Sequence, residues 1–180
     1  MNHPDGIEIA TVSSPGLIAD LVALQQDAFP PRMQFGNPRQ YYQEGFADES
    51  HVNVILRAPD GAVTGYLLAI PQNRIRAEMI SWDPAMPGDP GNLYIDLIQT
   101  LPGRRQITGL KTLLGGLCTE ARQRGIGRIS AHVRTATGLS RVVQKVVVDC
   151  RCLRRLDNWY DSGESFDFLD AATRLKTRAD

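Results

Sequence analysis

Two patterns of apolar residues recur along this chain, and together they predict a fold that mixes strands with helices. Alternation of apolar and polar residues, with many β-branched side chains, is typical of strands. Seven segments have this character: 7–12, 52–56, 63–70, 93–101, 129–134, 150–156 and 165–171. The second and third are expected to form a hairpin, because Ala58-Pro-Asp-Gly61 between them is a turn sequence.

Apolar residues at steps of three and four predict the helices. One such face consists of Ile107, Leu110, Leu114, Leu117 and Ala121, and Gly125 is placed to end that helix. Another helix is expected between Leu17 and Phe29, before Pro30-Pro31. Residues 38–48 are expected to form a helix or a lid-like loop, and 138–148 a helix that its valines make ambiguous. Residues 71–92, with four prolines and two glycines, are expected to form a loop or broken connection.

The length and composition favour an ordinary soluble protein with one domain over residues 1–180. A chain of 180 residues, with 42% hydrophobic and 22% charged residues, can bury a full core without metal or disulfide support. Its three cysteines lack the spacing of a zinc site, and an odd number suits a reducing compartment. No basic stretch precedes an apolar run at the N-terminus, and no segment is apolar enough to span a bilayer. We therefore expect no metal, no membrane partner and a cytoplasmic location.

The formal net charge of zero conceals two halves of opposite sign. Residues 1–90 contain five arginines, no lysine and eleven acidic residues, for a net charge of −6. Residues 91–180 contain fifteen basic and nine acidic residues, for a net charge of +6. Overall neutrality argues against general nucleic-acid binding, while the asymmetry indicates an acidic ligand for the second half. In the first half, Asp27, Glu44, Asp48, Glu49 and Asp83 could attract a cation or could be ordinary surface charges.

The basic junction between a predicted strand and the clearest helix is a candidate anion site. Its sequence is Thr100-Leu-Pro-Gly-Arg-Arg-Gln-Ile-Thr-Gly-Leu-Lys111. A helix start presents unpaired backbone N–H groups and partial positive charge, which suit a phosphate. Gly109 would let a ligand approach the backbone closely, and the basic side chains add charge. A solvated basic turn is the alternative interpretation.

A P-loop is one phosphate-binding motif that this junction could represent. Gly109-Leu-Lys111-Thr112 nearly completes it, and Val146-Val-Val-Asp149 is similar to its metal-binding strand. The spacing is wrong, because five residues separate Gly103 from Gly109 and Leu110 stands before the lysine. A P-loop-like nucleotide binder is therefore the weakest of the hypotheses.

A different resemblance covers nearly the whole chain. Gln106-Ile-Thr-Gly109-Leu-Lys111 resembles the [RQ]-x-x-G-x-[GA] pyrophosphate loop of the GCN5-related N-acetyltransferase (GNAT) family, with Lys111 in place of a small residue. The order of predicted elements agrees, and 154–168 are similar to the family's tyrosine-containing turn and last strand. The resemblance implies the GNAT acyl-CoA N-acyltransferase fold, of class α/β (α+β). This fold has a mixed, mostly antiparallel central sheet, flanked by helices, whose central strands splay apart.

The resemblance also implies a reaction: direct transfer of an acetyl group from acetyl-CoA, as co-substrate, to a primary amine within a ternary complex. The amine could belong to a small molecule or to a protein or peptide, and a homodimer stays open. The family's usual tyrosine at the end of its fourth helix is missing, which keeps a catalytically inactive CoA-binding or regulatory module as an alternative. The residues implied in cofactor binding are Ile98, Thr100, Arg104, Arg105, Gln106, Ile107, Thr108, Gly109, Leu110 and Lys111.

Three side chains are candidates for the chemistry of acetyl transfer. His132 resembles a strand-borne histidine of some protein N-terminal acetyltransferases, which accepts the amine's proton through water; a hydrogen-bonded structural histidine is the alternative. Asp96 could orient the amine or bind its charge, or be a paired structural carboxylate, and Tyr94 would share its strand face. Tyr160 could protonate the departing thiolate, or pack with Trp159 against the last strand.

Overall fold

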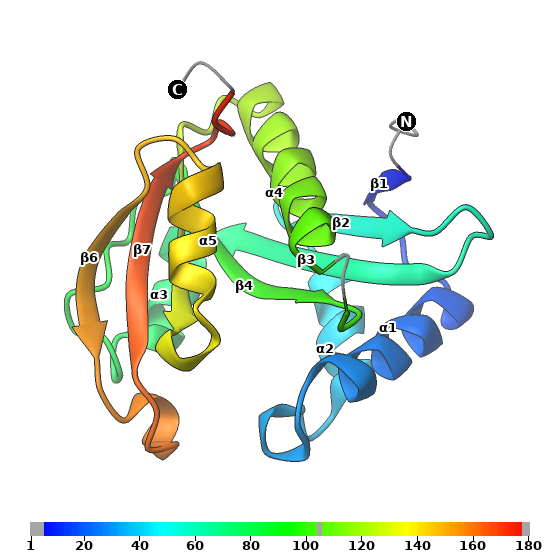
Figure 1. The fold of residues 1–180 in the computed structure, drawn as a ribbon, viewed down its shortest axis with the longest axis horizontal. Helices are drawn as coiled ribbons and strands as arrows, with labels where there is room; N and C mark the ends of the chain where they lie inside the picture. Colours follow the sequence, from blue (N-terminus) through cyan, green and yellow to red (C-terminus); the bar gives the residue numbers. More distant parts are fainter. Residues whose placement is uncertain (1–5, 104–105, 178–180) are drawn as a thin grey trace. The chain divides into compact units, whose positions relative to one another are not determined.

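The computed structural model describes residues 6–103 and 106–177, whose strands follow the order β1-β2-β3-β4-β5-β7-β6 in a seven-stranded sheet (Figure 1). The strands are β1 (Ile7–Ala10), β2 (Val52–Arg57), β3 (Val63–Pro71), β4 (Asn92–Thr100), β5 (Arg128–Arg134), β6 (Arg151–Leu156) and β7 (Phe166–Ala172). The helices are α1 (Pro15–Ala28), α2 (Pro38–Ala47), α3 (Gln72–Met79), α4 (Gln106–Gln123) and α5 (Leu139–Val146). β4 and β5 are parallel, whereas β1–β2, β2–β3, β5–β7 and β6–β7 are antiparallel. The predicted mixed sheet flanked by helices is confirmed.

Two segments with open predictions are helical, and one prediction is wrong. Residues 38–48 and 138–148 contain α2 and α5. Residues 71–92 were expected to lack regular structure, yet α3 occupies Gln72–Met79. This helix buries only Gln72, Ile75 and Met79, so it has too few apolar positions to produce a clear helical period. The prolines that suggested a loop lie at its start and in the connection after it.

The chain divides into two compact units. The first unit comprises the chain up to Ala69 together with Leu97–Glu120, and the second comprises Ile70–Asp96 together with the chain from Ala121 onward. Parallel pairing of β4 with β5 joins three residue pairs and ends at Tyr94↔Ser130, although both strands continue. This short pairing is the feature expected of central strands that splay.

In the first unit, helices cover both faces of β2 and β3 (Figure 1). A Cβ atom added at Gly45 of α2 would meet Leu68 and Tyr66, whereas one added at Gly116 of α4 would meet Val54 and Ile7. Neighbouring residues on a strand point to opposite faces. Because Val54 is paired with Leu67, it lies on the opposite face from Tyr66 and Leu68, so α4 and α2 contact opposite faces. A buried sheet with a helix on each face explains why β2 reads as a nearly continuous apolar run.

The approach of α4 to the sheet depends on Gly116, and this gives a stability prediction. An ideal Cβ there would lie 2.8 Å from Val54 Cγ1 and 3.1 Å from Ile7 Cγ2. We expect Gly116→Val to lower the free energy of unfolding by about 1–3 kcal/mol, because overpacking forces neighbours to shift. Gly16→Ala in α1 is the control, since its Cβ would meet only Ser14 Oγ at 4.0 Å. Urea unfolding of both variants tests this, and equal stability of Gly116→Val and wild type would contradict it.

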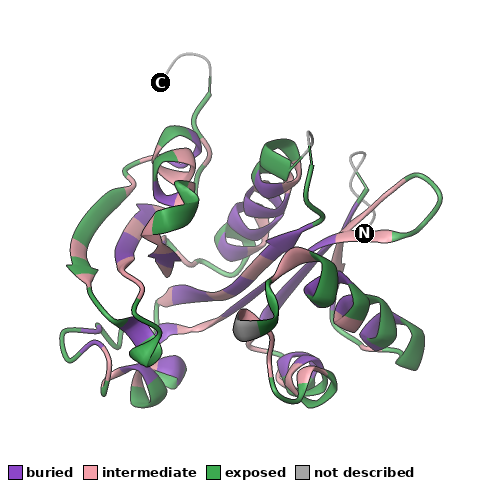
Figure 2. Cartoon of the chain, turned by 60° about the horizontal axis from the view of Figure 1, so that its bottom comes forward, coloured by how far each residue is buried: buried purple, intermediate pink, exposed green. Residues whose placement is uncertain are grey.

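The second unit is built on β5, β7 and β6. His132 on β5 is opposite Phe168 on β7, and Arg154 on β6 is opposite the same phenylalanine. Figure 2 shows that β6 is largely exposed, whereas β7 beside it is largely buried. The side chains of His132, Phe168 and Arg154, which lie side by side on these three strands, form a cluster with the connection between α3 and β4.

Candidate functional site

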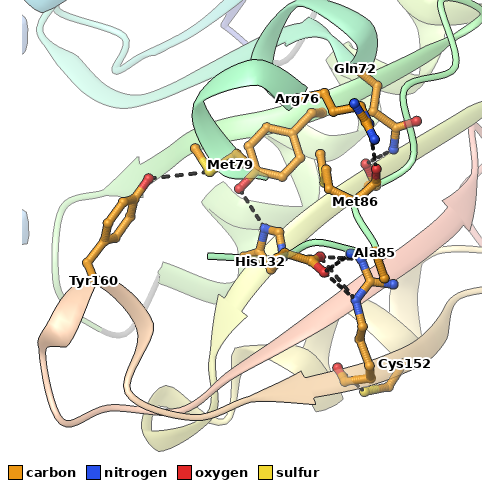
Figure 3. A network of polar contacts seen from close by, with 12 residues as sticks. Gln72, Arg76, Met79, Ala85, Met86, His132, Cys152 and Tyr160 are labelled. Atoms are coloured by element: carbon orange, nitrogen blue, oxygen red, sulfur yellow. Dashed lines mark hydrogen bonds and ion pairs between the residues drawn. The ribbon is translucent and has the colours of Figure 1, made fainter. Parts of the chain in front are cut away.

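The connection between α3 and β4 is held to the rest of the second unit by specific hydrogen bonds. Arg76 Nε donates to the carbonyl of Met86 at 3.0 Å, and Gln72 Nε2 donates to Ser130 Oγ at 2.8 Å (Figure 3). The backbone N–H of Asp83 donates to the carbonyl of Met79 at 2.8 Å. These bonds fix Asp83 in place, although proline and glycine residues surround it in the sequence.

His132 lies at the centre of a buried cluster, and both of its ring nitrogens have partners. Nδ1 lies 3.0 Å from the hydroxyl of Tyr94, and Nε2 lies 3.1 Å from Oδ2 of Asp83. The ring stacks on Trp159 at a centroid distance of 4.1 Å and contacts Phe168 at 4.8 Å. Its side chain is 1% exposed. The arrangement leaves neither nitrogen available to a water molecule or directly to a substrate.

Asp83 joins His132 to an arginine from the other side of the unit. Arg154 Nε donates to Oδ1 at 2.9 Å and to Oδ2 at 3.0 Å, and its Nη2 also contacts Oδ2. The guanidinium carbon lies 4.1 Å from the ring centroid of Phe168, within the range of a cation–π contact. The side chain of Asp83 is 1% exposed, so this carboxylate is buried and paired. The expectation that Asp83 could attract a cationic ligand is therefore wrong.

The surroundings of these groups shift their pKa values in different directions. Burial alone would raise the pKa of Asp83, but hydrogen bonds from Arg154 and His132 outweigh it and lower that pKa. Burial lowers the pKa of His132 to about 4, although Asp83 opposes the shift. Burial, together with the nearby charge of Asp96, raises the pKa of Tyr94 well above its ordinary value. At neutral pH the cluster therefore contains a carboxylate, a neutral imidazole and a protonated phenol.

Tyr160 lies at the tip of the β6–β7 connection, on a strained stretch of backbone. Asn158, Tyr160 and Asp161 have φ between 52° and 55°, a conformation that non-glycine residues adopt at a cost. The tyrosine is 52% exposed, and its hydroxyl donates to Met79 Sδ at 3.3 Å (Figure 3). Its ring meets that of Trp82 edge-on at 5.2 Å. Partial burial, with the charges of Asp96 and Glu78, raises the pKa of Tyr160 to about 12.

The structure thus brings the three predicted catalytic residues into one unit. Asp96 is half-buried and close enough to Tyr94 and Tyr160 to affect the pKa of both. His132 is linked to the same place by its contact with Tyr94. Sequence reasoning missed the role of Asp83 as a partner of His132 and missed Arg154 altogether. The signal was absent, since these contacts join residues 49 and 71 positions apart.

The predicted pyrophosphate loop begins α4 in the first unit. Gln106, Ile107 and Thr108 are exposed at the start of this 18-residue helix, with Ile107 at 56%. Ile107 was expected on the buried face, but only the later residues of that face are buried. Lys111 is also exposed, whereas the side chain of Leu110 is in the core. Leu110 could therefore meet a ligand only through its backbone.

Gly109 allows the first turn of α4 to lie against the end of β4. A Cβ added there would be 3.3 Å from both Leu56 Cδ2 and Thr100 Cγ2. Thr100 is buried and Ile98 is half-buried on the same strand. Arg104 and Arg105 lie outside the described residues, so their predicted contacts stay predictions.

The P-loop alternative does not fit the structure. It required Asp149 to follow a metal-binding strand, but α5 ends at Val146, and Val147 and Val148 belong to no strand. Asp149 lies in a turn with φ 49°, and its carboxylate accepts hydrogen bonds from Arg128 at 3.0 Å and Arg151 at 2.8 Å. The hydroxyl of Thr112, the second required ligand, donates to the carbonyl of Thr108 at 2.9 Å.

The part of the chain that the structure describes contains neither a cluster suited to a metal ion nor a helix suited to span a membrane. Within residues 6–103 and 106–177, histidine, cysteine and acidic side chains form no group of three that could hold a metal ion. The three cysteines are unbridged, with Cys118 buried and Cys152 exposed. Among the described helices, none has the length and apolar character required to span a membrane.

Comparison with known proteins identifies the fold. No family model and no curated protein matches the sequence. Among solved structures, an aminoglycoside 6'-acetyltransferase of type Ii superimposes with a TM-score of 0.69 at 14% identity, covering 95% of this chain and 99% of the other. The ribosomal-protein-S18-alanine N-acetyltransferase of Escherichia coli gives 0.64 at 14% identity, covering 96% of each chain. An aminoglycoside 6'-N-acetyltransferase complexed with coenzyme A gives 0.69 at 12% identity over 95% and 98%. The chain therefore has the GNAT fold.

Proposed function

We propose that this protein, which has the GNAT fold, is an N-acetyltransferase that transfers an acetyl group from acetyl-CoA to a primary amine. The observation that carries the proposal is the extent of the structural correspondence, which covers nearly the full length of both chains for proteins named as N-acetyltransferases. One of those proteins binds coenzyme A, which supports the same cofactor here. The proposal extends to the chemical class of the acceptor, a primary amine.

The start of α4 is the proposed site for the pyrophosphate of coenzyme A. Backbone N–H groups in the first turn of a helix lack intrahelical partners, and the helix dipole adds partial positive charge. Gln106–Thr108 are exposed there, and Lys111 places an ammonium one turn later. Gly109 keeps the turn close to β4, where the backbone near Ile98 and Thr100 would hold the pantetheine arm. Arg104 and Arg105 would add charge to the same loop.

The second unit supplies the proposed acid and the group that binds the amine. The substrate ammonium first gives one proton to solvent, and the neutral amine nitrogen then attacks the thioester carbon. The carbon–sulfur bond breaks, the thiolate takes a proton, and the second proton, which the nitrogen loses as the amide forms, restores the donor. Tyr160 would donate that proton, since its pKa of about 12 keeps it protonated at neutral pH. The half-buried carboxylate of Asp96 would bind the incoming ammonium. Both ring nitrogens of His132 have partners, so His132 would affect the amine indirectly, through its hydrogen bond with the hydroxyl of Tyr94.

Ligand-dependent melting tests the cofactor. A ligand at 100 times its Kd stabilises the folded state by about 2.7 kcal/mol, which raises the Tm of a protein of this size by roughly 5–10 °C. We expect acetyl-CoA to produce this shift and ATP with magnesium to produce none. Lys111→Ala should reduce the acetyl-CoA shift, while Lys145→Ala, on α5, should not. Stabilisation by ATP with magnesium alone would refute the proposal.

Release of free thiol with a panel of amines tests the chemistry. We expect Tyr160→Phe to reduce kcat roughly tenfold, a modest loss because a thiolate leaves without full protonation. Tyr41→Phe, which changes a tyrosine in the first unit, is the matched control and should turn over as wild type does. His132→Ala should also be slower once its folding is verified by melting. Unchanged turnover in both Tyr160→Phe and His132→Ala would remove these role assignments.

A further inference from the structure

Four side chains form one continuous polar chain in the second unit: Arg154 on β6, Asp83 in the α3–β4 connection, His132 on β5 and Tyr94 on β4. Arg154 Nε donates to Asp83 at 2.9 and 3.0 Å, Asp83 Oδ2 lies 3.1 Å from His132 Nε2, and His132 Nδ1 lies 3.0 Å from the Tyr94 hydroxyl (Figure 3). Tyr94, His132 and Asp83 are buried. Asp96 and Tyr160 of the proposed machinery lie near its tyrosine end, since the charges of both affect the pKa of Tyr94.

The direction of each hydrogen bond follows from the charge at the arginine end. A guanidinium has donors only, so Arg154 keeps Asp83 ionised, and an ionised carboxylate only accepts. Nε2 of His132 must then carry the proton. Because burial keeps the imidazole neutral, Nδ1 holds a lone pair and accepts from the hydroxyl of Tyr94. The opposite tautomer would point a lone pair of His132 at the carboxylate.

The surrounding side chains hold the imidazole ring of His132 in this orientation. Trp159 and Phe168 contact the imidazole at 4.1 and 4.8 Å. The backbone N–H of Asp83 donates to the carbonyl of Met79, and the N–H of Ala85 donates to Oδ1 of Asp83 at 3.2 Å, so the carboxylate is also fixed. With ring and carboxylate both fixed, the ion pair decides which nitrogen carries the proton.

We propose that Asp83 and Arg154 are positioning residues, which fix the proton of His132 on Nε2 and thereby make Tyr94 donate to Nδ1, with its phenolic oxygen left to accept a hydrogen bond from the substrate amine. The proposal rests on the proposed function for its last step only. Tyr94 would orient the amine beside Asp96, and the ion pair would act through His132 without touching the substrate.

The tautomer is measured directly by the ¹⁵N spectrum of the histidine side chains, of which the chain has three. We expect wild-type His132 to be protonated on Nε2 at pH 7. Asp83→Leu combined with Arg154→Met removes both charges, and an apolar replacement of a buried pair is often tolerated. In that variant the proton should move to Nδ1 or be shared between the nitrogens. Arg155→Met with Asp167→Leu removes the ion pair next along β6 and should leave the His132 signal unchanged.

The effect on the reaction is measured by kcat and KM. The Asp83→Leu/Arg154→Met variant should lose about 10- to 100-fold in kcat/KM for the amine, as metal-binding histidines do when the partner that orients them is removed. The KM for acetyl-CoA should not change. In a Tyr94→Phe background, the same double replacement should cause no further loss, which a merely structural role would not predict. Should the double variant fail to fold, Asp83→Asn keeps the size of the side chain and replaces it in both measurements.

Two outcomes overturn the inference. A His132 that stays protonated only on Nε2 without the ion pair would refute it, whatever the protein catalyses. If the Asp83→Leu/Arg154→Met variant, with Tyr94 intact, has a changed tautomer but turns over the amine as wild type does, the link to Tyr94 is refuted. If wild-type protein turns over no amine while the tautomer changes as expected, the proposed function fails and the positioning of the ring by Asp83 and Arg154 stands.

Discussion

Asp83→Ala is expected to lower the free energy of unfolding at pH 7 by about 3–5 kcal/mol, a large part of the stability of a protein this size. The substitution removes a carboxylate that is 1% exposed and leaves the guanidinium of Arg154, 23% exposed, without its partner. It also removes the acceptor for Nε2 of His132. Each orphaned donor keeps its desolvation cost and loses its bond. Urea unfolding at pH 7 measures the change.

Glu8→Ala is the matched control for this prediction. Glu8 also accepts from an arginine across two strands, with Arg57 Nε at 2.8 Å, but both side chains are about one-third exposed. A pair of this kind contributes about 0–1 kcal/mol, because water solvates the arginine that remains. We also expect Asp83→Leu with Arg154→Met to be more stable than Asp83→Ala, since no unpaired charge is left behind. Similar losses in Asp83→Ala and Glu8→Ala would contradict the assignment of Asp83 as a buried ion-pair partner.

The regular elements could be predicted from the sequence because each has a strong local pattern. Leu110, Leu114, Leu117 and Ala121 are buried on one face of α4, as their spacing requires. The hairpin of β2 and β3 follows from alternation around a Pro-Asp-Gly turn. α3 escaped prediction because it is short and buries few apolar side chains, so tertiary contacts such as that of Gln72 with Ser130 stabilise it more than its own pattern does.

Only those residues of the candidate site that stand out within one local segment could be predicted from the sequence. Asp96 was found because it alternates with apolar neighbours on one strand. His132 and Tyr160 were found because their strand and turn resemble those of a known family. The partners that determine the state of His132 could not be found in this way. Asp83 sits in a proline-rich connection and Arg154 in a basic edge strand, and no local pattern joins them. Long-range pairing of charges depends on the folded arrangement, which the sequence does not display.

The stability of the protein is expected to fall by about 3 kcal/mol between pH 6.5 and pH 4 through His132 alone. An unfolded histidine binds a proton below a pKa of about 6.5, whereas in the folded protein burial lowers the pKa of His132 to about 4. Between these values the unfolded chain binds more protons than the folded chain, so acid favours unfolding. The full difference between the two pKa values corresponds to about 3.5 kcal/mol, and about 3 kcal/mol of it is lost by pH 4, where the folded imidazole is half protonated. Asp83, Arg154 and Tyr94 are the titratable groups that face the ring.

The lowered pKa of Asp83 affects stability outside that pH range. The pKa of Asp83 is lowered, so its contribution is present above the pKa of an unfolded carboxyl, about 3.9, and is lost only as the pH falls further. His132→Gln keeps an amide donor for Asp83 and cannot titrate. The difference in unfolding free energy between wild type and His132→Gln should therefore change by about 3 kcal/mol from pH 7 to pH 4, in favour of the variant at low pH. His51→Gln, at a histidine outside the cluster, should keep the steep decline of wild type.

Parallel stability curves for wild type and His132→Gln would mean that the imidazole gains a proton in the folded state as readily as in the unfolded chain. That result would contradict a neutral, buried ring, because a histidine that titrates near 6.5 in the folded protein contributes no slope. It would also bear on the chemistry. An imidazolium has no lone pair for Tyr94, so the hydroxyl would accept from Nδ1, and its own hydrogen would be free to point at the amine. The effect of His132 on the unfolding free energy at low pH therefore tests the direction of the His132–Tyr94 hydrogen bond, on which the placement of the substrate depends.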